Sequence, residues 1–206
     1  MIKHYRYLLS LAICLSLAAC SNLRPSQPAP STMAANAQIQ HWQISGKIGL
    51  RDGSSGHSGY LNWQQCGNQF DIRLSGPLGQ GTAHLYGDSR QAKLVTNDQQ
   101  LFQARSAAEL LEQQLGWSLP VEQLFYWLRG IPSPDYPYQS YSHQTKQQAA
   151  STGLGFEQNH WQLSFLKFAE VDGYQLPSKI IAQKTPYKVT LVISQWQLPT
   201  NCEISE

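Results

Sequence analysis

The segment that most constrains the fold of this chain is 70–87, which reads FDIRLSGPLGQGTAHLYG. Apolar and polar residues alternate over 70–75 and again over 83–86, and a short connection rich in glycine and proline separates the two runs. Alternation with a period of two on both sides of such a connection predicts a β-hairpin. The segment therefore predicts two neighbouring antiparallel strands.

The tip of this hairpin is unusual because it holds a leucine. Turn residues are usually small or polar, since the tip faces water, yet Leu78 lies between Pro77 and Gly79. The proline restricts φ, and the glycines on either side permit turn geometries that other residues avoid. Two interpretations stay open on these residues alone. Leu78 either folds back onto the domain or is an apolar probe held out on a stiff base.

Residues 1–19 have the pattern of a secretory signal. Lys3 and Arg6 precede an almost unbroken apolar run over 8–17, and small residues lead into Cys20. The apolar run is too short to cross a bilayer as a helix. The Leu-Ala-Ala-Cys sequence resembles the bacterial lipobox, which implies cleavage before the cysteine, a diacylglycerol thioether on its sulfur and an acyl chain on its amino group. The alternative is an ordinary signal with an incidental cysteine.

The residues after the signal predict a tethered domain. Two or more acyl chains hold a protein stably on a membrane where one does not, and Ser21 stands where lipoproteins of the inner membrane typically carry aspartate. We therefore expect a lipid-anchored protein on the periplasmic face of the outer membrane. Residues 20–37 are rich in Pro, Ser and Ala, which predicts a flexible lipidated linker, and a single domain is expected over 38–206.

Removal of the signal leaves a chain without net charge. The 15 basic residues become 13 without Lys3 and Arg6, which equals the 13 acidic residues. A basic surplus or a Lys/Arg run, the electrostatic mark of a nucleic-acid-binding protein, is missing. Only 14% of residues are charged while 11% are aromatic, six of them Trp. This composition is typical of a domain with much apolar surface to place.

The remaining pattern is mainly β. Strand-like alternation recurs over 41–51, 60–66, 92–96 and 101–104, and in three stretches after 136. Gly46 indicates a bend or bulge in the first of these strands. The sequence DGSSGHSG over 52–59 predicts a flexible connection, and Asp172-Gly173 predicts a hairpin turn.

Between the strands the apolar period changes from two to 3.6. Ser106 and Glu109 form a capping box, and Gly116 stands where a helix-ending glycine is expected. A second predicted helix begins at Pro120 and ends before Gly130. It is apolar around more than one face, so it is either sandwiched or lines something other than the core of the protein.

Together these segments predict about ten or eleven antiparallel strands, with two or three helices inserted after the fifth or sixth. A sheet of this length does not stay flat and curls toward a barrel, and the helices can plug its open side. The predicted fold class is mainly β (α+β), an incomplete antiparallel β-barrel.

Several motifs carry a resemblance to a known family over about residues 39–198. They are Trp42, Ser45-Gly46-Lys47, Trp63-Gln64, Leu74, Gly76-Pro77-Leu78-Gly79, Leu115-Gly116-Trp117, Pro120-Val121, Leu124, Trp127-Leu128, Gly130 and Pro132. None is specific alone. In this order, and behind a lipobox, they resemble the LolB family, the outer-membrane lipoprotein receptors of the Lol pathway.

The resemblance implies an incomplete barrel with helices as a lid over a hydrophobic cavity. It also implies that the protein accepts lipoproteins from the soluble periplasmic carrier LolA and inserts their acyl chains into the outer membrane. The loop of Pro77, Leu78 and Gly79 matches the protruding loop associated with insertion. Insertion of one leucine yields only about 1.5–3 kcal/mol, too little to anchor a protein already held at Cys20. We therefore interpret Leu78 as touching or perturbing the lipid surface so that bound acyl chains can leave.

Thirteen residues are expected to line the acyl-binding cavity, although each of them could instead be ordinary core. They are Trp42, Ile44, Ile48, Leu61, Trp63, Phe70, Ile72, Leu74, Leu85, Leu124, Trp127, Leu163 and Phe165. Acyl binding needs only apolar area shielded from water. No cofactor is expected beyond the lipid on Cys20. The expected partners are a LolA-type carrier, lipoprotein acyl chains and outer-membrane lipids.

An enzyme is the competing interpretation, and the sequence gives it little support. Gly-x-Ser-x-Gly, His-Glu-x-x-His and Cys-x-x-Cys motifs are absent from the sequence. The histidines at 41, 57, 84, 143 and 160 lack the paired spacing of metal ligands, so no metal site is expected, and Asp71 with Arg73 predicts a surface pair. A second alternative is a calycin-like lipoprotein that holds a small hydrophobic ligand or acts as an envelope assembly scaffold.

Some properties stay open on the sequence alone. Cys66 and Cys202 would lie in an oxidising compartment, but whether they pair depends on a distance that the sequence does not give. A monomer is expected, although nothing in the sequence fixes the oligomeric state. The relative affinity for cargo, the docking surface of the carrier and the residues that touch acyl chains are likewise undetermined.

Overall fold

A computed structural model of the chain describes residues 30–77, 81–144 and 152–204. This part contains three helices, α2 (Pro30–Asn36), α3 (Ala107–Leu115) and α4 (Val121–Trp127). The strands are β1 (His41–Asp52), β2 (Ser55–Cys66), β3 (Gln69–Ser75), β4 (Thr82–Gly87), β5 (Ala92–Thr96), β6 (Leu101–Ala104), β7 (Tyr138–Gln144), β8 (Thr152–Gln158), β9 (Trp161–Val171), β10 (Tyr174–Lys184) and β11 (Tyr187–Gln197).

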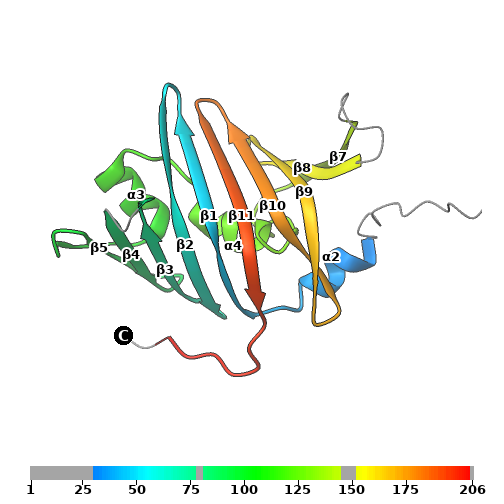
Figure 1. Cartoon of the computed structure of the whole chain (residues 1–206), viewed down its shortest axis with the longest axis horizontal. Helices are drawn as coiled ribbons and strands as arrows, with labels where there is room; N and C mark the ends of the chain where they lie inside the picture. The colour runs from blue at the N-terminus through cyan, green and yellow to red at the C-terminus, as the bar shows by residue number, and fades with distance from the viewer. Residues whose placement is uncertain (1–29, 78–80, 145–151, 205–206) are drawn as a thin grey trace, which may run out of the picture.

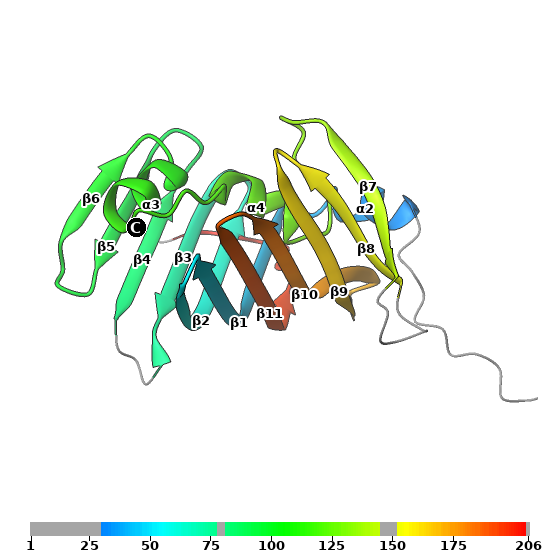
Figure 2. The ribbon, with the colours of Figure 1, turned by 90° about the horizontal axis from the view of Figure 1, so that it is seen from above.

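All eleven strands belong to one antiparallel sheet with the order β6-β5-β4-β3-β2-β1-β11-β10-β9-β8-β7. Its two edges, β6 and β7, do not pair with each other in the described part of the chain, so the barrel stays open. The predicted incomplete barrel is confirmed. Figure 1 shows β1 and β11 in the middle of the sheet, and Figure 2 shows the sheet curved into a trough that holds α3 and α4.

The two faces of the sheet differ in character because side chains alternate along each strand. We call the face toward α3 and α4 the inner face and the opposite one the outer face. A continuous row crosses the inner face from β1 to β5 in paired register, formed by Ile44, Trp63, Ile72, Leu85 and Leu94. All five are buried. The same alternation places polar and charged side chains on the outer face.

The local signals at the helices are confirmed. The hydroxyl of Ser106 accepts a hydrogen bond from the backbone N–H of Glu109 at 3.1 Å. Gly116 ends α3 with φ +69°, the left-handed conformation that glycine adopts without steric cost. In return, the Glu109 carboxylate accepts from the N–H of Arg105 rather than from that of Ser106. The capping box is therefore shifted by one residue on its carboxylate side.

The bulge expected at Gly46 lies in the partner strand. Ser45 pairs with Gln195 and Gly46 with Ile193, so the extra residue, Ser194, belongs to β11. A side chain at Gly46 would collide with the backbone carbonyl of Val192, which explains why glycine stands there. The register on the far side of this bulge keeps the apolar residues of β11 on the inner face.

Two predicted boundaries were wrong. The segment 52–59, expected to be a flexible connection, is mostly strand, since Asp52 pairs with Ser55 and only Gly53-Ser54 turn between β1 and β2. The predicted linker over 20–37 also extends too far, because α2 occupies its last part and packs against β10. Pairing and tertiary contacts overrode a composition that favours loops.

Asn36 at the end of α2 explains how this helix joins the domain. The side chain is buried, and its Nδ2 donates to the backbone oxygens of Arg129 at 2.8 Å and Gln175 at 3.0 Å. These two carbonyls come from the segment after α4 and from β10. Asn36 therefore connects α2 to the segment after α4 and to the sheet.

The two cysteines of the domain are paired in the structure. Cys66 at the end of β2 forms a disulfide with Cys202, with their Cα atoms 5.5 Å apart. The bond ties the C-terminal segment to the outer side of the sheet, a pairing that the sequence left open. Among the described residues, no helix combines the length and the apolar character needed to cross a membrane.

Replacement of Asn36 by alanine tests the attachment of α2. The change leaves the buried carbonyl oxygen of Arg129 and the partly buried one of Gln175 without this donor, so we expect the free energy of unfolding to fall by about 1–3 kcal/mol. Urea denaturation of the Asn36→Ala variant measures this. Gln38→Ala is the matched control, because Gln38 is exposed two residues further on. Equal stability of the two variants would contradict the proposed attachment.

Candidate functional site

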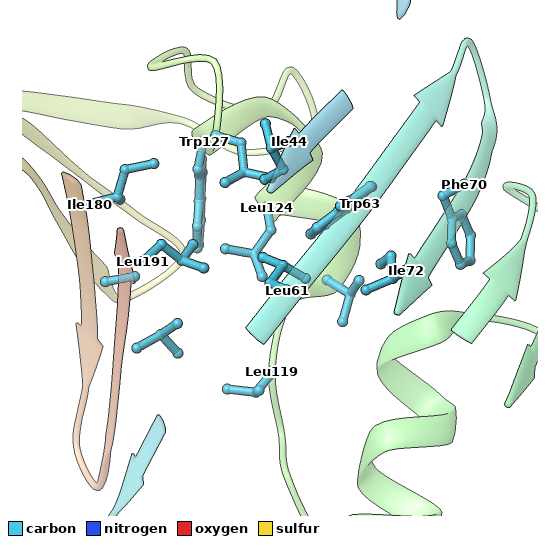
Figure 3. Close-up of a cluster of buried hydrophobic side chains, with 14 of the residues drawn as sticks. Ile44, Leu61, Trp63, Phe70, Ile72, Leu119, Leu124, Trp127, Ile180 and Leu191 are labelled. Carbon is cyan, nitrogen blue, oxygen red and sulfur yellow. The ribbon is translucent and has the colours of Figure 1, made fainter. Parts of the chain in front are cut away.

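The structure brings the thirteen predicted cavity residues together on the inner side of the domain. All of them belong to a single apolar cluster. Ile48 and Leu74 are partly buried at its margin, and the others are buried. Figure 3 shows several of these side chains converging between the sheet and α4, including Ile44, Trp63, Phe70 and Leu124.

Aromatic contacts join α4 to the sheet. The ring of Phe125 on α4 lies 5.3 Å from Trp63 in an edge-to-face arrangement and 5.5 Å from Phe70. Trp42 continues the contact across the sheet, 5.4 Å from Trp63 and 5.7 Å from Trp196. Aromatic pairs at these separations add about 0.5–1.5 kcal/mol each beyond their buried area. The cover over the inner face is therefore attached largely by apolar contacts.

The described residues hold this interior in a closed form. Side chains of the sheet and α4 fill the space between them, as the burial of Trp42 and Trp127 to 1% and 0% exposure shows. Two open hollows of the described part lie elsewhere, on the outer face, with volumes of about 370 and 510 Å³. The cavity lining is thus present, but room for a ligand requires side chains or the helical cover to move.

Polar bonds fix the C-terminal end of α4. The Oε1 atom of Gln158 on β8 accepts from the indole N–H of Trp127 and from the backbone N–H of Ser133, both at 2.8 Å. Its Nε2 donates to the carbonyls of Ser133 and Tyr136 at 2.8 and 2.7 Å. All hydrogen-bonding capacity of this buried amide is used. The end of α4 and the segment after it are therefore pinned to the edge region of the sheet.

Arg129 forms a second polar anchor beside α4. Its Nε donates to the carbonyl of Phe125 at 3.1 Å and its Nη1 to that of Ile39 at 2.5 Å. The guanidinium also lies over the ring of Tyr126, 5.3 Å from its centre. Burial lowers the pKa of Arg129 from its ordinary value, since the charged form is desolvated. The guanidinium of Arg129 therefore links the chain just before β1 to α4.

Sequence reasoning missed part of this site. The polar anchors Gln158 and Arg129 carried no signal, because a glutamine in a strand and an arginine after a helix are usually exposed. It also left out apolar residues that complete the interior, although their alternation was visible. These are Ile39, Leu94, Leu110, Leu119, Leu128, Phe156, Trp161, Leu176, Ile180, Val189, Leu191, Ile193 and Trp196.

The predicted insertion loop and lipidation site lie largely outside the described residues. Cys20, Leu78 and Gly79 are not described, while Pro77 is exposed. The base of the loop is closed by a hydrogen bond from the N–H of Gly76 to the carbonyl of Gly81 at 3.0 Å. The strands on either side pair in register up to this base. The hairpin that carries the loop is thus confirmed, and its tip stays a prediction.

The outer face carries the predicted pair of Asp71 and Arg73. The guanidinium Nε lies 3.1 Å from the carboxylate, and the ring of His84 lies 2.7 Å from the other carboxylate oxygen. All three point away from the apolar interior, since their neighbours Ile72 and Leu85 face it. Over the described ranges, no group of three or more His, Cys, Asp or Glu residues is placed to hold a metal ion.

Comparison with known proteins identifies close sequence relatives. A family model described as outer membrane lipoprotein LolB matches residues 40–196. The outer-membrane lipoprotein LolB of Stutzerimonas stutzeri (strain A1501) is 41% identical over 199 residues, which is 92% of this chain and 94% of that protein. The protein of the same name from Pseudomonas paraeruginosa is 43% identical over 161 residues, 78% of this chain and 76% of that one.

Solved structures with little sequence similarity share the fold. A LolA superfamily protein from Nitrosomonas europaea has a TM-score of 0.52 at 13% identity and covers 86% of this chain and 96% of that one. A putative outer membrane lipoprotein-sorting protein domain from Vibrio parahaemolyticus has a TM-score of 0.53 at 9% identity, with 84% and 92% covered. At these identities the likeness shows the fold alone.

Replacement of Gln158 by leucine tests the anchor of α4. The variant keeps a similar volume but leaves the Trp127 indole N–H and the Ser133 backbone N–H without an acceptor, so we expect a loss of about 2–4 kcal/mol in the free energy of unfolding. Chemical denaturation followed by Trp fluorescence measures it. Gln162→Leu, at an exposed position on β9, is the control. A stable Gln158→Leu variant would show that apolar contacts alone hold the helix.

Proposed function

This chain belongs to the LolB family of outer-membrane lipoproteins, and on that premise we propose how its structure performs the role of the family. It is a lipid-anchored receptor for lipoproteins at the outer membrane. We propose that lipoproteins arrive on a LolA-type carrier, that their acyl chains enter the space between the sheet and α4, and that they leave from there into the membrane. The observation that carries this proposal is the apolar inner face beneath a helical cover.

The physical need for such a site follows from the acyl chain. Each methylene group exposed to water costs about 0.8 kcal/mol, so a lipoprotein with several long chains does not cross an aqueous space unshielded. The inner face offers apolar side chains on strands from β1 to β5, and the row continues over β11 to β8. Such a surface can exchange contacts with α4 for contacts with acyl chains. The sheet behind it need not change its pairing.

The closed structure makes α4 the element that must yield. Phe125 fills the position between Trp63 and Phe70 that an acyl chain would take. The C-terminal end of the helix is pinned to the sheet through Trp127 and Gln158. Its N-terminal side is bonded to α3 instead, because the carboxylate of Glu122 accepts from the backbone N–H of Ala108 at 3.2 Å. Entry of cargo is therefore expected to swing or lift the N-terminal side of α4 while its C-terminal end stays attached.

The same proposal makes this a binding protein rather than an enzyme. Binding of acyl chains requires no catalytic group, and the titratable trio of Asp71, Arg73 and His84 lies on the opposite face of the sheet. Transfer from the carrier is favourable only if the interior binds acyl chains more tightly than the carrier does. Each tenfold difference in affinity corresponds to about 1.4 kcal/mol of binding free energy. We expect one copy of the chain to suffice.

A photo-crosslinking amino acid at position 125 tests the site of entry. Benzoylphenylalanine in place of Phe125 is expected to crosslink to the acyl chains of a lipoprotein delivered by a LolA-type carrier. The same group at Tyr60, which is 50% exposed on the outer face, is the control and is expected to give no acyl crosslink when the reaction contains no membrane vesicles. Crosslinks at both positions, or at position 60 alone, would place the cargo elsewhere.

Leu78→Glu separates receipt from insertion. A carboxylate at the tip of the hairpin does not enter the lipid surface, so the variant is expected to receive cargo at the normal rate and to insert it into vesicles at least tenfold more slowly. Pull-down of cargo measures receipt, and flotation with vesicles measures insertion. Leu101→Glu is the control, since Leu101 is a leucine 52% exposed on β6.

Either of two results would count against this division of roles. Normal insertion by the Leu78→Glu variant would remove the tip from the mechanism. Loss of receipt would mean that the tip acts on the carrier or the cavity instead. If wild-type protein takes up a small hydrophobic dye but no lipoprotein, the chain is a ligand-binding lipoprotein and not a receptor.

A further inference from the structure

The outer face of the sheet carries cations that no carboxylate balances within the described residues. We call this set the basic strip; it consists of Lys47, Arg51, Lys167, Lys179 and Lys188. Lys179 is half-buried and the others are exposed. None of the five forms an ion pair in the described part of the chain. The strands that carry the strip, β1, β9, β10 and β11, contain two carboxylates, Asp52 at the hairpin end of β1 and Glu170 near the end of β9.

The register places like charges against each other. Arg51 is the direct partner of Lys188, and Lys179 is the direct partner of Lys167. Lys47 joins the same row, because it pairs with Val192 from one side while Lys179 pairs with it from the other. Neighbouring strands lie about 4.8 Å apart, and like charges directly opposite each other destabilise a sheet. An anionic partner on this face would remove that repulsion.

Three carboxylates of the domain lie on the side opposite to the basic strip. Glu109, Glu112 and Glu122 belong to α3 and α4, which lie inside the trough (Figure 2). The chain after the signal has as many acidic as basic residues, so the basic strip does not reflect a basic protein. The five cations of the strip are instead gathered on one part of the outer face, while three of the carboxylates lie on the helices that cover the inner face.

The surroundings of the strip match the chemistry of a lipid surface. A hollow of about 510 Å³ lies on the outer face, lined by Arg51 and Lys188 together with Gly49, Gly56 and Ser58. Its small side chains leave space beside two cations, which suits a phosphate group. Exposed apolar groups are interleaved with the cations, since Tyr60 and Val192 are 50% and 44% exposed. Lys and Tyr with aliphatic neighbours are typical of bilayer interfaces.

We propose that the basic strip rests on the anionic phospholipid headgroups of the leaflet to which the chain is anchored, with a lipid phosphate between Arg51 and Lys188. The proposal depends on the proposed function, because it needs the domain held at the membrane by its lipid. The contact between the basic strip and the headgroups sets the orientation of the domain on the membrane. The middle strands face the leaflet, and α3 and α4 face the periplasm, from which a carrier arrives.

The hairpin agrees with this orientation. The end of β3 that leads to Gly76 extends to the outer side of the sheet (Figure 2). The basic strip and the hairpin therefore face the same membrane surface. An acidic protein surface is the other possible partner of the strip. The exposed Tyr60 and Val192 and the location of the receptor at the membrane favour lipid.

Headgroup proximity in the lipidated, full mature protein tests the proposal. A fluorescent amino acid is placed either at Thr190, in the middle of the outer face, or at Gln114, exposed on α3. The protein is reconstituted in phosphatidylethanolamine vesicles, with or without phosphatidylglycerol, that carry a headgroup-linked quencher. We expect quenching at Thr190 to exceed that at Gln114 about fivefold or more, to require phosphatidylglycerol and to fall at high salt.

Charge reversal supplies the matched comparison. Lys47→Glu/Lys188→Glu should abolish most of the quenching at Thr190, since each cation contributes roughly fivefold to binding of an anionic surface. The variant Arg90→Glu/Arg105→Glu changes the net charge equally at side chains that are 87% and 93% exposed outside the strip, and should leave quenching unchanged. Folding is expected to survive, because Glu at 188 would face Arg51; thermal unfolding verifies it.

The outcomes separate the two proposals. Equal quenching at both probes, stronger quenching at Gln114, or indifference to phosphatidylglycerol overturns the lipid-binding strip. Normal quenching in Lys47→Glu/Lys188→Glu together with impaired receipt of cargo overturns it in favour of an acidic protein partner. If the wild-type orientation is as expected but no lipoprotein is transferred, the strip stands and the proposed function fails.

Discussion

An apolar inner face that extends from β5 to β8 is the constraint on which the structure depends. Such a face cannot stay in water, and a sheet of eleven strands cannot stay flat. The sheet therefore curls, and α3 and α4 fill the trough. Because β6 and β7 do not meet in the described part, the cover is made by helices rather than by closure of the barrel. A helical cover can move while every strand pair stays intact. A closed barrel, in contrast, opens only when the hydrogen bonds between two of its strands break.

The attachments of this cover are of two kinds, and the difference bears on function. Apolar contacts such as Phe125 on Trp63 can be replaced by contacts with an acyl chain at little net cost, since both are apolar. The bonds of Gln158 and Arg129 cannot be replaced by a lipid, because it offers no matching donors or acceptors in the interior. The fold thus contains one exchangeable surface and one fixed end, which suits a lid that opens without detaching.

The two faces of the sheet differ in chemical character, and each suits a different contact of a lipoprotein receptor. The inner face carries the apolar interior, whereas the outer face carries the basic strip, whose cations form no ion pair with the described residues, and exposed apolar groups such as Tyr60. Strand alternation makes this division possible, since a single strand supplies both faces from consecutive residues. Lys47, for example, lies on the outer face while its neighbour Ile48 packs against the interior cluster. One layer of sheet separates the proposed site for lipid tails from the surface proposed to contact headgroups.

The sequence by itself determined most of the strand and helix pattern, the incomplete barrel and part of the apolar interior. These follow from local periodicity and from capping signals such as Ser106 and Gly116, which act within a few residues. Only the tertiary structure decided which segments are ordered by contacts far along the chain. Asn36 orders α2 through carbonyls at 129 and 175, and the strand at 55–59 forms because β1 pairs with it. The basic strip likewise depends on register, because its cations come from four strands, β1, β9, β10 and β11, and meet only when these strands are aligned side by side.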